Sequence, residues 1–134
     1  MTLATFEDIE RFALGLPEAE FGITWGDRPT FLVRGRGFVR FRPPTADCID
    51  PETNEPMDDV IVFVTPSAEA KAALVGDDSP FFTIPHFDRS NDVLLRRRDI
   101  GQLTAAELEE VIIEGWLCRA PKKLVKAYLA DSAG

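Results

Sequence analysis

The chain has 134 residues, of which 45% are hydrophobic and 28% charged, and this is enough material for one domain with a core of its own. There are 23 acidic residues against 15 Lys and Arg, so the formal net charge of −8 opposes nucleic acids and anionic membranes on average. No apolar run is long enough to span a membrane, and the first residues are not expected to form a signal peptide. Two lone cysteines and a single His predict a cytoplasmic protein without a metal or cofactor.

The charges are segregated along the sequence. Residues 34–42 hold four Arg and no acid, residues 89–98 hold four Arg and one Asp, and residues 119–126 hold four bases and no acid. By contrast, residues 47–59 carry six acids and no base. Blocks of one sign can bind partners that the net charge alone would repel, so these blocks are the first functional candidates.

The N-terminal residues predict a helix followed by a strand. Thr5 can cap a helix over residues 5–14, where apolar side chains recur at helical spacing, and Gly15 then ends it. A strand is expected over residues 21–25. The turn expected after this strand is Gly26-Asp27-Arg28-Pro29.

An alternating pattern over residues 30–42 predicts a β-hairpin. Gly35-Arg36-Gly37 would form a three-residue loop, with Gly37 in the left-handed conformation. This register places one set of side chains on the core face and a second set on the opposite face. The core set is Phe31, Val33, Val39 and Phe41, and the opposite set is Leu32, Arg34, Phe38, Arg40 and Arg42.

The rest of the chain predicts a mixture of strands and helices. The expected elements are an exposed acidic loop over 43–59, a central strand over 60–64, a helix from Pro66 to about Val75, strands over 81–85 and 93–97, a helix opened by a Thr104–Glu107 capping box, and a last helical piece over 122–129. We therefore predict a single α+β domain over residues 1–134. It should have two layers, an antiparallel sheet with helices packed on one face, in the order helix, three or four strands, helix, two strands, helix.

Several short motifs resemble the MmcQ/YjbR family in order over nearly the whole chain. They are Leu14-Gly15-Leu16-Pro17-Glu18-Ala19-Glu20, Trp25-Gly26 with Pro29-Thr30-Phe31, the Arg/Gly hairpin, and Ala120-Pro121-Lys122-Lys123-Leu124. The resemblance implies a small single-domain protein related in fold to secretion chaperones and compared with bacterial frataxin. It also implies DNA binding, through a proposed double-wing motif.

The arginine face of the hairpin is the first candidate for such binding, because guanidinium groups bind phosphate in bidentate fashion. Arg96 and Arg98 should point to one side and Arg97 to the other. Duplex binders use roughly six to ten phosphate contacts, so we expect modest, salt-sensitive affinity. Alternatively, these arginines cover a solvated sheet face or pair with the acidic loop. The candidate contacts are Arg34, Arg36, Phe38, Arg40, Arg42, Arg96, Arg98, Lys122 and Lys123.

The second hypothesis is a module that binds a protein, a second copy of itself or a small ligand. It would use the sheet face or a pocket edged by Trp25, Arg28, Phe31 and His86. His86 is followed by Asp88 and Ser90, but no nucleophile elbow surrounds the serine. We therefore predict no enzymatic activity.

Overall fold

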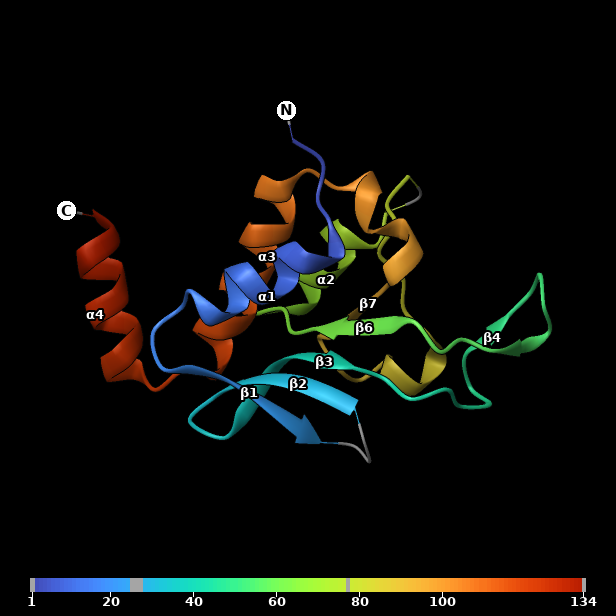
Figure 1. Ribbon diagram of the computed structural model, residues 1–134, viewed down its shortest axis with the longest axis horizontal. Coiled ribbons are helices and arrows are strands. Elements are labelled where there is room, and N and C mark those ends of the chain that lie inside the picture. Colours follow the sequence, from blue (N-terminus) through green and yellow to red (C-terminus); the bar gives the residue numbers. More distant parts are fainter. Residues whose placement is uncertain (1, 25–27, 77, 134) are drawn as a thin grey trace.

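A five-stranded antiparallel sheet forms one layer of the molecule, and helices pack on one of its faces (Figure 1). The predicted two-layer α+β fold is confirmed. The computed structural model describes residues 2–24, 28–76 and 78–133, so Trp25, Gly26 and Asp27 lie outside the described residues. The expectation of a turn over Gly26-Asp27-Arg28-Pro29 is wrong for its last two residues, because Arg28 and Pro29 pair with Thr24 and Ile23 in the sheet. The strands of this sheet are, in spatial order, β1 (Ala19–Thr24), β2 (Arg28–Val33), β3 (Arg36–Phe41), β6 (Val60–Phe63) and β7 (Val93–Arg96).

Two helices form most of the second layer, α1 (Phe6–Leu14) and α3 (Ala105–Arg119). The predicted capping box of α3 is present: the Thr104 N–H donates to the Glu107 carboxylate at 2.8 Å, and the Glu107 N–H donates to the Thr104 hydroxyl at 3.1 Å. None of the helices in the described part of the chain has the length and hydropathy that crossing a membrane would require. The remaining helices are α2 (Ala68–Leu74) and α4 (Lys122–Ala133).

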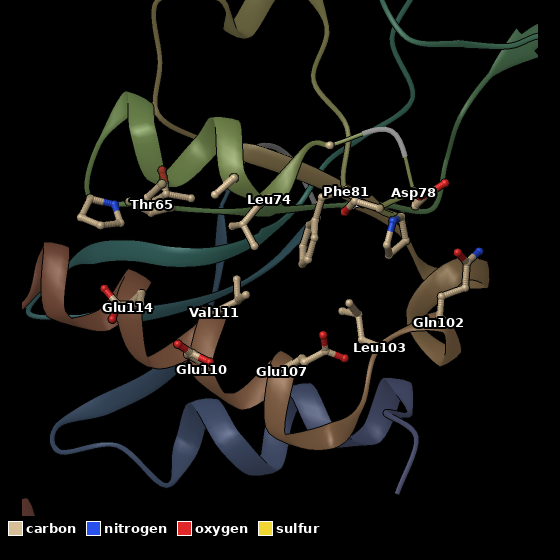
Figure 2. A pocket seen from close by; sticks show the side chains of 17 residues that line it. Thr65, Leu74, Asp78, Phe81, Gln102, Leu103, Glu107, Glu110, Val111 and Glu114 are labelled. Atoms are coloured by element: carbon tan, nitrogen blue, oxygen red, sulfur yellow. Dashed lines mark hydrogen bonds between the residues drawn. The ribbon is translucent and has the colours of Figure 1, made fainter. Parts of the chain in front are cut away.

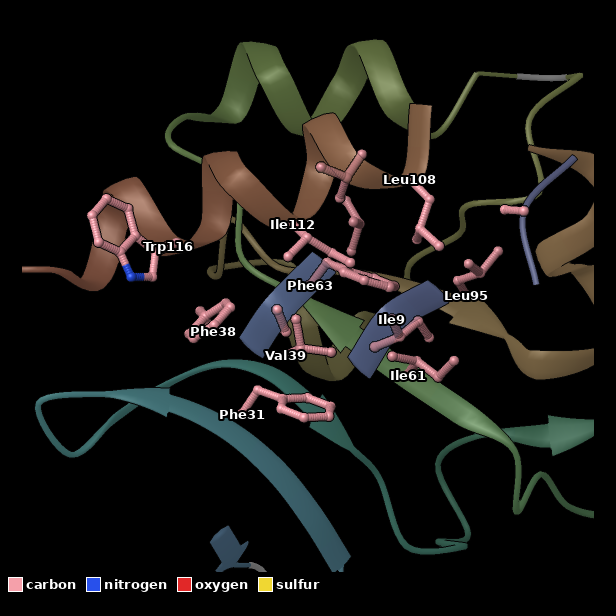
Figure 3. Packing of buried hydrophobic residues seen from close by; sticks show 14 of the residues in the cluster. Ile9, Phe31, Phe38, Val39, Ile61, Phe63, Leu95, Leu108, Ile112 and Trp116 are labelled. Carbon is pink, nitrogen blue, oxygen red and sulfur yellow. The ribbon is translucent and has the colours of Figure 1, made fainter. Parts of the chain in front are cut away.

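The main hydrophobic core lies between α1, α3 and the sheet (Figure 3). Trp116 of α3 is fully buried, and its indole N–H donates to the carbonyl of Pro17 at 3.1 Å. Gly115 allows a close approach to the sheet, because a Cβ atom there would lie 3.2 Å from the carbonyl oxygens of Phe38 and Val64. One side of α3 is therefore fixed on the sheet, which leaves the opposite side for other contacts.

The β2–β3 hairpin is present, but its turn differs from the prediction. Arg34 and Gly35 form a two-residue turn, with φ angles of 51° and 79°. Positive φ at both positions is typical of hairpin turns whose twist matches that of the flanking strands. The expectation of a three-residue loop with Gly37 in the left-handed conformation is therefore wrong.

A β-bulge at Phe38 corrects the register that the shorter turn would otherwise impose. Leu32 pairs with Gly37 and Phe31 with Val39, so Phe38 is the extra residue on its strand. Both Phe38 and Val39 are buried in the main core. The predicted apolar core set of this hairpin is confirmed, but the placement of Phe38 among the arginines is wrong.

Residues 43–59 are not the simple exposed loop that the sequence predicts. They include a small hairpin of β4 (Ile49–Asp50) and β5 (Glu55–Pro56), which Figure 1 shows at one end of the molecule. Cys48 from this segment joins Val62 of the sheet in a second, smaller core. The face of the sheet opposite the helices is therefore covered in part by the acidic segment.

Two further predictions between the acidic segment and β7 need correction. Helix α2 begins two residues later than expected because the Ser67 hydroxyl caps it, accepting a hydrogen bond from the Ala70 N–H at 3.1 Å. The strand expected over 81–85 is not formed. Phe82 alone pairs with the sheet there, in an isolated bridge, and a short 3₁₀ helix starts at Pro85, which has no N–H to donate to a ladder.

Candidate functional site

The arginines expected to bind nucleic acid on the sheet are held by acidic groups of the same chain. Arg96 is buried, its Nη1 donates to Asp50 Oδ2 and its Nε donates to Asp59 Oδ1, both at 2.9 Å. Hydrogen bonds from the Glu52 N–H and from Arg96 lower the pKa of Asp50. Arg96 therefore ties β7 to the acidic segment and is not available to an external phosphate.

Arg40 and Arg42 are paired in the same way. Arg40 Nη2 donates to Asp92 Oδ2 at 2.7 Å, and the buried Arg42 donates through Nη2 to Asp47 Oδ2 at 2.8 Å. The hydrogen bond from Arg42, followed by one from Thr45, lowers the pKa of Asp47 to about 2. These pairs neutralise the charge that the sheet was expected to present to a polyanion.

Arg98 lies at the edge of this network. Its side chain is half exposed, and its Nη1 lies 3.9 Å from Asp50 Oδ2. The expectation that Arg96 and Arg98 point to one side is confirmed, because both reach Asp50. Arg97 points to the helical side, where its guanidinium lies 3.8 Å from the centre of the Phe6 ring.

The tip of the β2–β3 hairpin meets the junction of α3 and α4. Arg36 Nη1 donates to the carbonyl of Arg119, and Arg119 Nε donates to the carbonyl of Gly37, both at 3.3 Å. Arg34, also at this tip, pairs with Glu18. A set of bases here forms no ion pair with any described residue. We call this set the basic corner: Arg36, Arg119, Lys122 and Lys123.

The ligand pocket expected around Trp25, Arg28, Phe31 and His86 does not form from the residues that the structure describes. Phe31 is buried in the main core on the helical side of the sheet. His86 is exposed, and its Nδ1 lies 3.7 Å from the carboxylate of Asp47 in the acidic segment. Arg28 donates to a backbone carbonyl of that segment at 3.4 Å. Trp25 lies outside the described residues.

A different cavity, of about 760 Å³, lies between α2 and α3. Figure 2 shows Leu74 of α2 and Val111 of α3 pointing toward each other across it. Phe81 and Leu103, both buried, complete its apolar floor. We call this cavity the α2–α3 groove.

The rim of the α2–α3 groove is acidic. Glu107, Glu110 and Glu114 follow one another along α3, and Asp78 lines the groove as well. No Lys, Arg or His is among the described residues that line it. Glu107 caps α3, whereas Glu110 and Glu114 form no ion pair with any part of the chain that the structure describes. This arrangement favours a ligand that carries positive charge on an apolar body.

The rim is not arranged as a metal centre. Within the described ranges, no group of three or more His, Cys, Asp or Glu side chains is placed to hold a metal ion. The carboxylates instead stand one helical turn apart along α3, as separate charges above the apolar floor.

Sequence reasoning missed the groove, although part of its signal was present. Glu107, Glu110 and Glu114 recur at helical spacing, and Val111 lies between them, so one helix face combines charge with an apolar residue. The other wall comes from residues 64–81, and no local pattern places that segment against α3.

Proteins similar to this chain occur in mycobacteria. Uncharacterized protein Rv2570 of Mycobacterium tuberculosis is 35% identical over 136 residues, which cover 97% of this chain and 99% of the relative. Uncharacterized protein Mb2600 of Mycobacterium bovis matches with the same identity and coverage. This chain belongs to their family. No model of a protein family and no solved structure matches the sequence.

Proposed function

We propose that this protein is a non-enzymatic binding module, whose site is the α2–α3 groove and whose ligand carries a positive charge on an apolar body. The observation that carries the proposal is the acidic rim above an apolar floor, with no base among the described lining residues. A volume of about 760 Å³ falls within the range of roughly 300–1,000 Å³ that is typical of ligand sites.

The surroundings of His86 support a non-enzymatic role. His86 is exposed beside Asp47, whereas the Ser90 hydroxyl accepts a hydrogen bond at 2.9 Å from the backbone N–H two residues further on. A nucleophile, its base and an orienting acid are thus not assembled around His86. Burial raises the pKa of the free thiols of Cys48 and Cys118, which disfavours the thiolate that nucleophilic catalysis requires. Free thiols also fit the cytoplasm.

A fluorescent apolar amine tests the proposal. Dansylcadaverine joins an aromatic ring system to a primary ammonium group, and it should bind the protein saturably with a blue shift of its emission. Combining Glu110→Gln with Glu114→Gln should weaken binding about tenfold, because two rim charges are lost. Dansylglycine, which carries a carboxylate in place of the amine, should not bind.

Matched variants separate the groove from the overall charge. Glu109→Gln combined with Glu55→Gln removes the same charge from exposed positions outside the groove, and this variant should bind like the wild type. Ala73→Lys places an ammonium group at an exposed position of the groove wall and should abolish binding while leaving the core intact. Equal affinities of the wild type and the Glu110/Glu114 variant would reject the proposal.

The basic corner supports a second candidate function, modest DNA binding of the kind that the resemblance to the MmcQ/YjbR family implies. Its bases lie at one end of the molecule, where the hairpin tip meets the start of α4 (Figure 1). Four bases, or five with Arg34, fall below the roughly six to ten phosphate contacts of strong duplex binders. Binding through this corner would therefore be weak and would fall steeply with salt.

Electrophoretic mobility shifts at about 50 mM and 200 mM salt test this second candidate. A shift of duplex DNA is expected at the lower salt concentration and should be lost when Arg36→Ala is combined with Lys122→Ala. Arg98→Ala is a control for the loss of a single base outside the basic corner, because this exposed arginine already lies near acids of its own chain. If the wild type gives no shift at the lower salt concentration, DNA binding is rejected.

A further inference from the structure

We infer that the occupant of the α2–α3 groove is an amphipathic α-helix of a partner protein, with Lys or Arg along the edge of its apolar face. This inference rests on the proposed function. The proposed function specifies the charge of the ligand, and the inference specifies its secondary structure. It follows from the length of the groove, the nature of its walls and the placement of its acids.

The groove continues beyond the first cavity. A second cavity, of about 560 Å³, shares residues 64–66 and Glu114 with the first and extends to Leu117 and Cys118. From Glu107 to Cys118 the joined cavities follow α3 for about 17 Å, or about three helical turns. We call the two joined cavities the trough, and its length matches a segment of polypeptide.

The walls favour a helical occupant over an extended one. Opposite α3, the first cavity is bounded largely by α2, whose backbone groups already bond within the helix. The second cavity is bounded there by residues 64–66 and 90–92, none of which lies in a strand. The trough therefore offers no strand edge to an extended peptide. A docked helix would satisfy its own backbone groups. Ala70 and Ala73 line the trough from α2, and their small side chains allow the backbone of a neighbouring helix to come close.

Helix α2 gains little burial from its own chain. None of its residues is fully buried. It is held by Lys71, whose Nζ donates to the carbonyls of Phe87 and Ser90, both at 2.7 Å. A helix lying between α2 and α3 would cover Leu74, which is half-buried, and would complete the packing of α2.

The charges around the trough favour basic residues on the docked helix. Glu107, Glu110 and Glu114 stand at intervals of three and four residues along one wall, so bases at the same interval on the partner would face them. Arg119 lines the far end of the second cavity. We therefore place the basic residues of the partner toward the Glu107 end.

A synthetic peptide of about 16 residues tests this inference. It contains Leu, Ala and Lys, with Leu at helical spacing on one face and Lys on both flanks of that face. Its isomer has the same composition in an order that breaks the spacing. The amphipathic peptide should gain helical circular dichroism on binding, and the isomer should bind at least about tenfold more weakly. Amide shifts in NMR spectra should move along α2 and α3 and stay constant along β1.

Variants of the full chain test whether the peptide binds at the acids of the groove. The Glu110→Gln/Glu114→Gln variant should bind the peptide about tenfold more weakly, and the Glu109→Gln/Glu55→Gln variant should match the wild type. Dansylcadaverine tests the proposed function, a positively charged ligand in the groove, separately from the helical shape of the occupant. Binding of the amine without discrimination between the two peptides would overturn the helical occupant and leave the proposed function standing, whereas failure of both probes would overturn both.

A second copy of the chain is the competing occupant, because α4 carries Lys122, Lys123 and Lys126. Light scattering after size exclusion should show a monomer at concentrations where the peptide binds. A dimer that dissociates in the Glu110→Gln/Glu114→Gln variant would overturn the inference in favour of self-association through the groove.

Discussion

The acidic segment over 43–59 and the acidic side of α3 both carry negative charge, but their carboxylates make different contacts. In the segment, Asp47, Asp50 and Asp59 each meet an arginine of the sheet at 2.8–2.9 Å. Along α3, Glu110 and Glu114 meet no base among the described residues. Acids of the first kind join the acidic segment to the sheet, and acids of the second kind are those that we propose bind a partner. The two kinds should respond differently to mutation and to pH.

The largest effect is expected where the acidic segment meets the sheet. Arg96→Met should lower the free energy of unfolding by about 3–5 kcal/mol, because Asp59 loses its base and the buried Asp50 keeps only the more distant Arg98. Arg98→Ala, at the exposed edge of the same network, should cost less than about 1 kcal/mol. Urea unfolding followed by tryptophan fluorescence measures both. Equal losses would mean that burial does not distinguish the two arginines.

The close packing of α3 on the sheet at Gly115 should give the next largest effect. Gly115→Ala adds a methyl group 3.2 Å from two backbone oxygens and should destabilise by about 1–2 kcal/mol, even after the gain in helix propensity. Gly101→Ala is the control, since a Cβ atom there meets nothing within 4 Å. Thermal unfolding of both variants gives the comparison. A neutral Gly115 variant would show that α3 can shift away from the sheet.

The pairing of Asp47 predicts a specific dependence on pH. Its pKa falls from 3.8 to about 2 on folding, so its stabilising contribution is present above about pH 4 and is lost as pH falls toward 2. Asp47→Asn should cost about 1 kcal/mol or less at neutral pH, because the carboxylate is partly exposed. Unfolding at several pH values should show a shallower acid slope for this variant. A slope identical to that of the wild type would remove Asp47 from the acid response.

The smallest effect on stability is expected at the groove. Glu110→Gln combined with Glu114→Gln should stabilise by about 0.2–0.5 kcal/mol, because like charges four residues apart on a helix repel each other. Glu109→Gln, on the same helix but outside the groove, should change stability by less than about 0.5 kcal/mol. Thermal unfolding measures both. A loss above about 1 kcal/mol would mean that the groove acids serve the fold after all.

The elements with local signals could be predicted from the sequence. The Thr104–Glu107 capping box fixes the start of α3, and Gly15 follows the end of α1 as expected. The apolar, β-branched run at 60–64 predicts the buried strand β6. In each case a few neighbouring residues determine the structure, so no information from distant parts of the chain is needed.

The features that depend on distant residues could not be predicted. The sequence predicts correctly that Arg40 and Arg42 face away from the helices, whereas Arg34 lies in the turn and Phe38 in the core. The acids that neutralise Arg40 and Arg96 come from other segments, which no local pattern shows. The groove likewise joins α3 to residues 64–81. Spacing along one helix shows which face its carboxylates share, and it does not show whether a base of the same chain lies opposite.

The extra residue at Phe38 has a consequence for how this hairpin can change in length during evolution. A two-residue turn followed by an unbroken ladder would send Arg40 and Arg42 toward the helices, and the bulge sends them toward the acidic segment instead. Deleting one residue between the turn and Val39 would remove the extra residue of the bulge. Arg40 and Arg42 would then still face the acidic segment. Deleting Arg40, the residue just after Val39, would instead turn Arg42 toward the apolar layer. Tolerance of deletions should therefore change abruptly at this point of the strand.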